Sequence, residues 1–427
     1  MNIVRRVVCR VVQLGFRAVL PILPYSEPEI LKSLDEVPGL LRDKGISSVL
    51  LVSDPGIKKA GLYQGLASQL EGAGIACTVY ADTCANPTIE NIDAAYGLYR
   101  EHRCRALIGF GGGSAMDCAK TVGARVAQPK KPVAKMGGLF KIHRRIPLLV
   151  AVPTTAGTGS EVTLAAVVND TAHHHKYAIE DFALIPPYAV HDYRVTVGLP
   201  PQVTAATGMD ALTHAVESYI GRSTDAYTRR CAEKAVQLIH DNLLTAYRNG
   251  KDVEARRAMQ TAAYRAGVAF TRSYVGYVHG VAHSLGGMYG VPHGLANAVA
   301  LPHVLRAYGH ACDRKLARLA RVAGVAGAEA SDAEAACRFI AWIDEMNASM
   351  GIPQHLDCIK AADIPLMAHY CDVESNPLYP VPVLMNEHEL EHLYRVVAGV
   401  PGEQEVPCGH SLVYETGAAV RHMLGGA

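Results

Sequence analysis

The sequence lacks several features that mark common classes of protein. Its charges nearly balance, because 41 basic and 40 acidic side chains give a formal net charge of +1. Nucleic-acid-binding proteins usually carry a basic surface, so we expect no nucleic-acid partner. No run of about 18 apolar residues occurs, which argues against a membrane-spanning helix. The sequence also contains no internal repeat and no low-complexity tract.

The eleven cysteines lack the pattern of a secreted disulfide framework. They include no C-x-x-C pair and follow no regular spacing, whereas such frameworks have closely patterned cysteines in shorter chains. We therefore expect reduced cysteines that behave as small apolar residues, in a cytoplasmic protein.

What is present is a globular composition, with 49% hydrophobic and 19% charged residues. A chain of 427 residues exceeds what one hydrophobic core normally holds, so we expect at least two domains.

The first 26 residues depart from this even composition. They contain Arg5, Arg6, Arg10 and Arg17, and no acid precedes Glu27. Such a basic extension could be an organelle transit peptide or a membrane-surface helix. We favour the third interpretation, an amphipathic extension packed on the rest of the protein.

Residues 27–199 alternate between short apolar runs and stretches with helical spacing. This pattern predicts an α/β domain with a Rossmann-like, doubly wound parallel sheet. The predicted strands are 48–53, 75–80, 106–110 and 148–153, and the clearest helices are 87–102 and 114–127.

After the Pro200–Pro201 pair the pattern changes to helix formers with a period near 3.6. We therefore predict an all-helical second domain at 200–427, and a ligand site in the cleft between the domains. The predicted helical stretches are 202–247, 253–290, 312–350 and 387–425.

A glycine-rich loop follows the third predicted strand. In ALIGFGGGSAMDCAK, residues 106–120, four glycines fall within five positions and a helix is predicted from Ser114. Glycines let the backbone approach a diphosphate, and a helix N-terminus offers free N–H groups. Alternatively, Ser114 and Asp117 form only a capping box. The acid of the usual dinucleotide fingerprint follows its glycines, whereas Asp54 precedes them and could equally cap a turn.

A hydroxyl-rich loop, PTTAGTGSEVT at 153–163, follows the next predicted strand. Thr154, Thr155 and Thr158 offer donors for a phosphate or a ribose, although an ordinary connecting loop would have a similar composition. Two such loops at the carboxyl ends of parallel strands favour the binding interpretation.

The predicted helical domain contains a candidate metal site. Asp210 and His214 are four residues apart and share one helical face, and His279, His283 and His293 follow in a second cluster. One carboxylate and several imidazoles suit a divalent metal, although a lone buried histidine is more often a core residue. The spacing leaves open which of the three later histidines bind. The run 173–175 is expected on an exposed loop.

Four motifs in this order resemble the iron-containing (group III) alcohol dehydrogenase family, over roughly residues 30–400. They are GGGSAMDCAK, PTTAGTGSEVT, GMDALTHAVESY and HGVAHSLGGMYGVPHG. The resemblance implies an oxidoreductase that transfers a hydride between a primary or secondary alcohol, or its aldehyde or ketone, and NAD. It also implies Fe²⁺, or alternatively Zn²⁺, polarising the substrate oxygen. A homo-oligomer is expected.

The resemblance also assigns roles to residues. Asp210, His214, His279 and His293 match the family's metal ligands, and His283 matches a histidine beside the nicotinamide, our candidate proton relay. The positions that match cofactor contacts are Asp54, Asn86, Gly112, Gly113, Ser114, Asp117, Thr154, Thr155, Thr158, Thr163 and Lys176.

Two rival hypotheses remain at this point. A metal- and NAD-dependent lyase of the dehydroquinate synthase kind would need a Glu as first ligand and more basic residues around it, whereas this chain has Asp210 in a weakly charged neighbourhood. A catalytically silent NAD-binding protein would have no physical need for four metal ligands.

Overall fold

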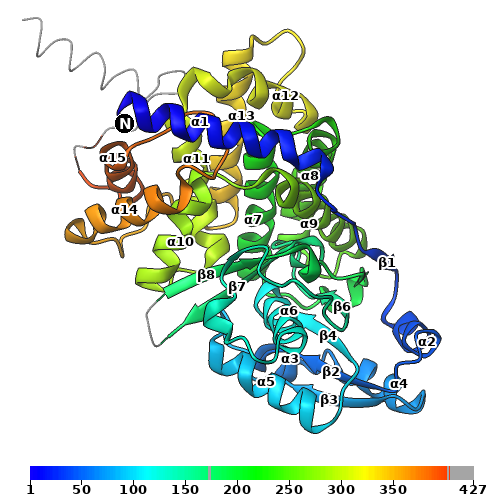
Figure 1. The fold of residues 1–427 in the computed structure, drawn as a ribbon. Coiled ribbons are helices and arrows are strands. Elements are labelled where there is room, and N and C mark those ends of the chain that lie inside the picture. Colours follow the sequence, from blue (N-terminus) through cyan, green and yellow to red (C-terminus); the bar gives the residue numbers. More distant parts are fainter. Residues whose placement is uncertain (172–174, 402, 404–427) are drawn as a thin grey trace, which may run out of the picture. The chain divides into compact units, whose positions relative to one another are not determined.

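The computed structural model describes residues 1–171, 175–401 and 403 (Figure 1). By its contacts the chain forms two compact units. The α/β unit comprises Pro24–Pro200 and Gly250–Thr271, and the helical unit comprises Met1–Leu23, Pro201–Asn249 and the residues from Arg272 onward. The predicted division into an extension at 1–26 and domains at 27–199 and 200–427 stays a prediction.

The α/β unit contains a six-stranded sheet in the order β1-β9-β6-β4-β2-β3, and all of its strand pairs are parallel. The four strands predicted from the sequence correspond to β2, β3, β4 and β6, which confirms them. The strands are β1 (Glu29–Leu31), β2 (Ser48–Val52), β3 (Ala76–Tyr80), β4 (Ala106–Gly111), β6 (Leu148–Pro153) and β9 (Tyr188–Val190).

Both faces of this sheet are buried. Along β2, Val49 and Leu51 point into one hydrophobic core, and Leu50 and Val52 point into the other. This alternation is the two-residue period of a strand that is covered on both sides. The helices of the unit are α2 (Val37–Asp43), α3 (Pro55–Ala60), α4 (Gln64–Gly72), α5 (Ile89–Glu101), α6 (Gly113–Ala127) and most of α9 (Val253–Ser273).

A second, three-stranded sheet was not predicted. It consists of β5 (Gly138–Leu139), β8 (His175–Glu180) and β7 (Ala165–Asp170), and β7 pairs antiparallel with β8. Burial alternates along β7, but its small residues give a weak hydrophobic pattern. In the run predicted on an exposed loop, residues 173 and 174 lie outside the described residues.

The helical unit is built around α7, which is buried from Gly208 to Ile220 on every side. Residues 404–425 of the last predicted helical stretch lie outside the described residues. Among the helices that the structure describes, none is long and apolar enough to cross a membrane. The helices are α1 (Ile3–Val19), α7 (Pro201–Ile220), α8 (Ala226–Arg248), α10 (Tyr277–Tyr289), α11 (His293–Ala307), α12 (Asp313–Ala323), α13 (Asp332–Ser349), α14 (Ile364–Ser375) and α15 (Glu387–Val397).

The cysteines follow the sequence expectation in most cases. Nine described cysteines are free thiols, and most of them are buried. Cys337, in contrast, is disulfide-bonded, so the expectation of reduced cysteines is wrong at that position.

Candidate metal and cofactor sites

Three predicted ligands from three helices converge in the helical unit. The Asp210 Oδ1 atom on α7 lies 3.9 Å from His279 Nε2 on α10 and 3.6 Å from His293 Nε2 on α11. Their ligand atoms all lie within 4.8 Å of one another. His214, one turn after Asp210, has its Nδ1 4.0 Å from Asp210 Oδ1, and its ring stacks on His279 at 4.6 Å between centroids.

Glycines next to the ligands allow these helices to approach closely. A Cβ on Gly294, directly after His293, would lie 2.4 Å from the Ala206 carbonyl oxygen of α7. A Cβ on Gly280, directly after His279, would lie 2.6 Å from the Ser375 hydroxyl of α14. The small residues that surround the histidines in the sequence are therefore required by packing.

Asn297, which the sequence reasoning missed, lies at the centre of this cluster. Its Nδ2 is 2.7 Å from Asp210 Oδ1, 3.3 Å from His279 Nε2 and 3.2 Å from His293 Nε2. Its own Oδ1 is buried and has no hydrogen-bond partner in the part of the chain that the structure describes. Asp210 Oδ1, His279 Nε2 and His293 Nε2 are thus three acceptors that point at one place, and the Asn297 Nδ2 group contacts all three. Such a set of acceptors fits a divalent cation.

Glu217 on α7 fixes the orientation of His279. Its Oε2 accepts hydrogen bonds from His279 Nδ1 at 2.6 Å and from the Gly276 N–H at 2.9 Å, and its Oε1 accepts one from the Val278 N–H at 2.8 Å. With Nδ1 as the donor, the lone pair of His279 Nε2 faces the cluster.

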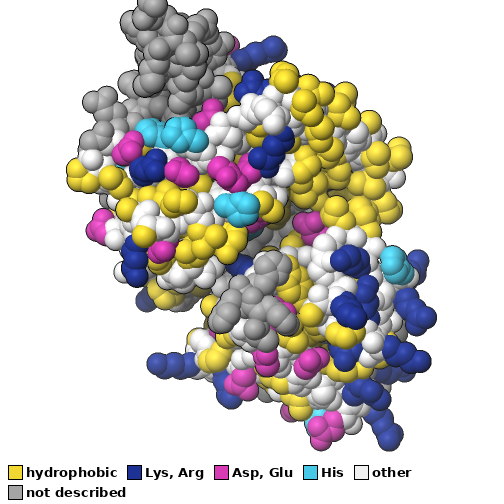
Figure 2. All heavy atoms as spheres, turned by 60° about the vertical axis from the view of Figure 1, so that its left-hand side comes forward, with side chains coloured by type: hydrophobic (Ala, Val, Ile, Leu, Met, Phe, Trp, Pro, Cys, Tyr) yellow, Lys and Arg dark blue, Asp and Glu magenta, His cyan; other side chains and the backbone are white. Residues whose placement is uncertain are grey.

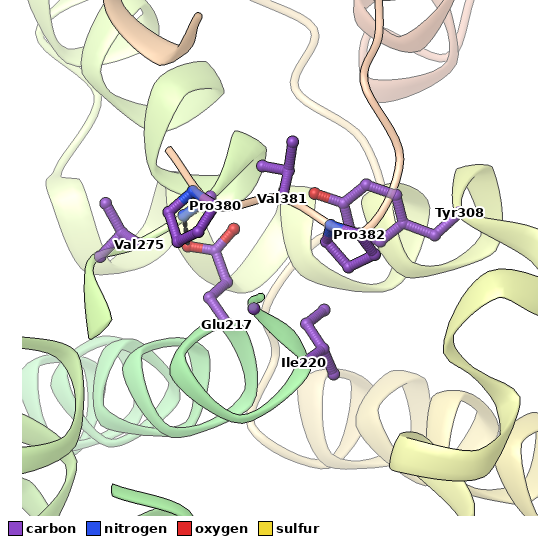
Figure 3. Close-up of a pocket in the computed structure, with 9 residues that line it drawn as sticks. Glu217, Ile220, Val275, Tyr308, Pro380, Val381 and Pro382 are labelled. Carbon is purple, nitrogen blue, oxygen red and sulfur yellow. Dashed lines mark hydrogen bonds between the residues drawn. The ribbon is translucent and has the colours of Figure 1, made fainter. Parts of the chain in front are cut away.

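Electrostatics also favour the neutral form of His279, which a metal ligand needs. Burial lowers the pKa of His279 to about 3, which keeps the imidazole neutral, as a metal ligand must be. Burial also raises the pKa of Glu217 to about 7, although the backbone N–H groups of Gly276 and Val278 oppose this rise. Glu217 additionally lines a small pocket with Val275, Pro380 and Val381, and none of the three converging ligands borders that pocket (Figure 3).

His283 lies beside the ligands and is held by a different carboxylate. Its ring stacks on His293 at 5.3 Å between centroids, and its Nδ1 is 2.5 Å from Glu374 Oε1. Tyr379 donates a hydrogen bond to the same carboxylate oxygen at 2.6 Å. Burial alone would raise the pKa of Glu374, but the charge and hydrogen bond of His283 and the hydrogen bond of Tyr379 hold it below its usual value. No pattern in the sequence indicated a role for Glu374.

In the α/β unit, the two predicted cofactor loops lie against each other. A Cβ on Gly113 would lie 2.9 Å from Thr158 Cγ2, and one on Gly112 would lie 3.5 Å from Thr155 Cγ2. The Thr155 hydroxyl is buried and has no hydrogen-bond partner among the described residues. An unused hydroxyl beside an uncapped helix N-terminus fits an anionic ligand such as a diphosphate.

The capping-box interpretation of Ser114 and Asp117 is wrong. Helix α6 begins at Gly113 with Gly112 as N-cap, and no side chain caps it. The Asp117 carboxylate instead accepts hydrogen bonds from the Ser160 hydroxyl at 2.7 Å and the Val167 N–H at 3.0 Å. Burial raises the pKa of Asp117. Its carboxylate therefore connects α6 to the second loop and to β7.

A buried lysine makes a second connection between these elements. Lys120 on α6 donates to the Thr163 carbonyl and the Ala165 carbonyl, both at 2.8 Å, and to the Thr163 hydroxyl at 3.0 Å. The carbonyl and the hydroxyl of Thr163 therefore both accept hydrogen bonds from Lys120. Thr154 is almost fully buried, and its N–H donates to the Gly111 carbonyl at 2.9 Å.

The remaining cofactor candidates surround the glycine loop. Asp54 is the N-cap of α3, where its Oδ1 accepts from the Ile57 N–H at 3.0 Å, so the turn-capping role is present. Asp54 Oδ2 lies 3.1 Å from where a Cβ of Gly111 would be, which places this carboxylate at the loop. The Asn86 N–H donates to the Ser114 hydroxyl at 3.1 Å, and Lys176 lies on β8 opposite Asn169.

Both units match one family in comparison with known proteins. Residues 31–193 match the description "Iron-containing alcohol dehydrogenase", and residues 204–397 match "Fe-containing alcohol dehydrogenase family, C-terminal". The chain belongs to the iron-containing alcohol dehydrogenase family. It is 36% identical to a 1,3-propanediol dehydrogenase of Klebsiella pneumoniae over 384 residues, which are 89% of this chain and 98% of that protein.

Two further similar proteins support the same family. An NAD-dependent methanol dehydrogenase of Bacillus methanolicus is 34% identical over 351 residues, which are 81% of this chain and 92% of that protein. The crystal structure of a 1,3-propanediol oxidoreductase is 35% identical, with a TM-score of 0.84 over 87% of this chain and 99% of that one.

The enzyme is therefore an NAD-dependent alcohol dehydrogenase of the iron-containing family, with a metal site in its helical unit. This confirms the predicted reaction class and fold class, α/β plus all-α. The lyase and the catalytically silent protein, weighed as rivals on the sequence, are set aside.

Proposed function

We propose that Asp210, His214, His279 and His293 hold one Fe²⁺ ion, with Zn²⁺ as the alternative. The observation that carries this proposal is the convergence of three ligand atoms within 4.8 Å, with His279 held in the ligating tautomer by Glu217. Nitrogen and carboxylate donors suit both metals. When bound, the ion supplies Lewis acidity to the substrate oxygen.

His283 is our candidate for moving the proton. Because the Glu374 carboxylate accepts from Nδ1–H, Nε2 of His283 is the atom that takes a proton from the substrate side during alcohol oxidation. The side chain is 28% exposed, so the proton can pass on to water. Glu374 and Tyr379 hold the ring in place for this step.

We propose that the α/β unit binds NAD through the two loops. Gly112 and Gly113 provide close backbone approach, the hydroxyls of Thr155 and Thr158 face these glycines, and Asp54 binds the adenosine ribose. Asp117 and Thr163 hold the loops in place through Ser160 and Lys120. The other proposed contacts are Asn86, Ser114, Thr154 and Lys176.

The substrate we propose is a small primary alcohol or its aldehyde. The relatives that are a 1,3-propanediol dehydrogenase and a methanol dehydrogenase support this choice. We also propose that the protein is a homo-oligomer and that it is cytoplasmic; the nine free thiols support the second proposal, and the disulfide-bonded Cys337 is the exception.

One experiment tests the central proposal. The metal content of the purified protein is measured, and NAD reduction is followed with a panel of small primary alcohols before and after dialysis against a chelator. We expect one metal ion per chain, activity lost on chelation, and recovery with Fe²⁺ or Zn²⁺. A chelated, metal-free protein that oxidises alcohols at the native rate would contradict the proposal.

A further inference from the structure

Helix α1 turns its apolar side away from the protein. Cys9 and Gln13 are buried, whereas the apolar positions on the opposite side are 39–71% exposed. More than half of the large exposed hydrophobic side chains of the described chain lie in residues 3–22. The exposed positions on the helix are Ile3, Val4, Val7, Val8, Val11, Val12, Leu14 and Val19.

These positions form one continuous face. At about 100° per residue they span roughly half of the helix circumference, and only Gly15 and Ala18 fall among them. No polar residue interrupts this arc. Figure 2 shows a broad field of hydrophobic side chains with Lys and Arg side chains at its edge. Folded monomers rarely expose large continuous apolar patches, so a face of eight exposed large apolar side chains indicates an interaction surface.

The inner side of α1 is fixed by polar contacts. Arg5 pairs with Asp372 at 2.6 Å, Arg10 donates to the Val381 and Pro382 carbonyls at 2.8 Å each, and Gln13 donates to the Tyr379 carbonyl at 2.7 Å. Rotating the helix to hide its apolar side would break all of these contacts. The outward orientation of the apolar face is therefore built into the fold.

Positive charge borders this face. Arg6 and Arg17 are exposed, and neither forms an ion pair with a described carboxylate. Burial, together with the charges of Arg229, Arg222 and Arg17, lowers the pKa of Lys315 to about 8, which shows that these arginines are close enough to Lys315 to repel its charge. On the Arg5 side, the acids Asp372 and Glu387 offset the charge of that arginine.

This distribution of charge selects between two kinds of occupant. A second copy that docked its α1 on this face would bury the apolar arc, but with no acid on either helix it would offer the arginines no opposite charge. An anionic lipid surface, in contrast, accepts the apolar arc among its acyl chains and the arginines at its headgroups.

We propose that the outer face of α1 binds the surface of a bilayer that contains anionic lipids. The helix lies parallel to the surface, with Ile3, Val7, Val11 and Leu14 inserted below the headgroups. Arg6 and Arg17 remain at headgroup level, next to the lipid phosphates.

The test is cosedimentation of the full-length protein with vesicles of phosphatidylcholine alone or mixed with phosphatidylglycerol. We expect binding to the mixed vesicles. The variant V7N/V11N should bind about 100-fold more weakly, since burial of a Val side chain contributes roughly a tenfold change or more. The variant R6Q/R17Q should lose about 30-fold on the mixed vesicles and little on the neutral ones.

The matched control is L139N/V203N, which removes two similarly apolar, partly exposed side chains outside α1 and should bind as the parent does. All four proteins should oxidise alcohols at the same rate, so this test is independent of the proposed function. The proposal is overturned if the parent binds neither vesicle or if V7N/V11N binds normally. It is also overturned if V7N/V11N instead lowers the oligomeric state in size-exclusion chromatography, because a second copy would then be the occupant.

Discussion

Replacing Glu217 by glutamine probes how the metal site is held. The carboxylate accepts three buried hydrogen bonds through two oxygens, two at Oε2 and one at Oε1. A glutamine has one oxygen, so in either orientation its NH₂ group faces at least one buried N–H. Leaving such a donor unsatisfied costs about 1–3 kcal/mol of folding free energy.

The orientation of the glutamine decides the effect on the metal. With its NH₂ toward His279, the imidazole must accept at Nδ1 and carry its proton on Nε2, which then points at Asp210 and cannot bind a metal. We expect metal affinity to fall about 10- to 100-fold, the usual effect of losing a hydrogen-bond partner of a ligating histidine, or roughly 1.4–2.7 kcal/mol.

Two measurements separate these effects. Equilibrium dialysis against a competing chelator gives the metal affinity, and urea unfolding of the metal-free protein gives the stability. Glu389→Gln is the matched control, because Glu389 is also buried in the helical unit and accepts from the Asn386 N–H at 2.7 Å, away from the ligands. If Glu217→Gln keeps the parent's metal affinity while Glu389→Gln behaves as expected, the tautomer argument is refuted.

Four further predictions concern other residues of the metal site and of the α/β unit. His214→Ala should lose bound metal and turnover but still bind NAD, as measured by metal analysis and NADH titration; full turnover without metal would contradict it. His283→Ala should keep the metal but lower turnover on the order of 10²-fold and change its pH profile; a loss of metal would make His283 a ligand. The native enzyme should prefer NAD over NADP by roughly 10- to 100-fold, because two unit charges 4 Å apart repel by about 4 kcal/mol before salt and solvent reduce it. Asp54→Asn keeps a cap for α3 and removes the charge, so it should narrow this preference in steady-state kinetics; an unchanged ratio would leave Asp54 as a cap only. Burial lowers the pKa of Lys120 from 10.5 to about 8, so the unfolded chain binds more protons between these values and stability should rise with pH across that window, by up to about 3 kcal/mol relative to Lys120→Met in urea titrations.

The sequence predicted best what local pattern determines. The strands β2, β3, β4 and β6 are short apolar runs because each is buried on both faces, and such runs are visible without any knowledge of partners. The glycine loop and the Asp210–His214 pair were equally visible, since each depends on neighbours a few residues away.

The residues that complete the site could not be read in the same way. Asn297 meets Asp210 across 87 residues, Glu217 meets His279 across 62, and Glu374 meets His283 across 91. None of these pairs has a spacing that a helix or strand would repeat, so only the packing of α7, α10, α11 and α14 brings them together. Of the three, Asn297 offered a partial signal, because it lies one turn after His293.

Helix α1 shows where pattern and packing disagree. Its sequence predicts an amphipathic helix, and such helices normally turn the apolar stripe inward. Here the inner side holds Cys9 and Gln13, and Arg5 and Arg10 beside them donate to Asp372 and to the carbonyls of Val381 and Pro382. Hydrogen bonds to charged groups contribute about 1.5–3 kcal/mol each, which competes with the burial of a valine side chain. The valine-rich face that is turned outward in exchange leaves apolar surface in water, and burial in another apolar phase would remove that cost, which is the reason to look for one at a lipid surface.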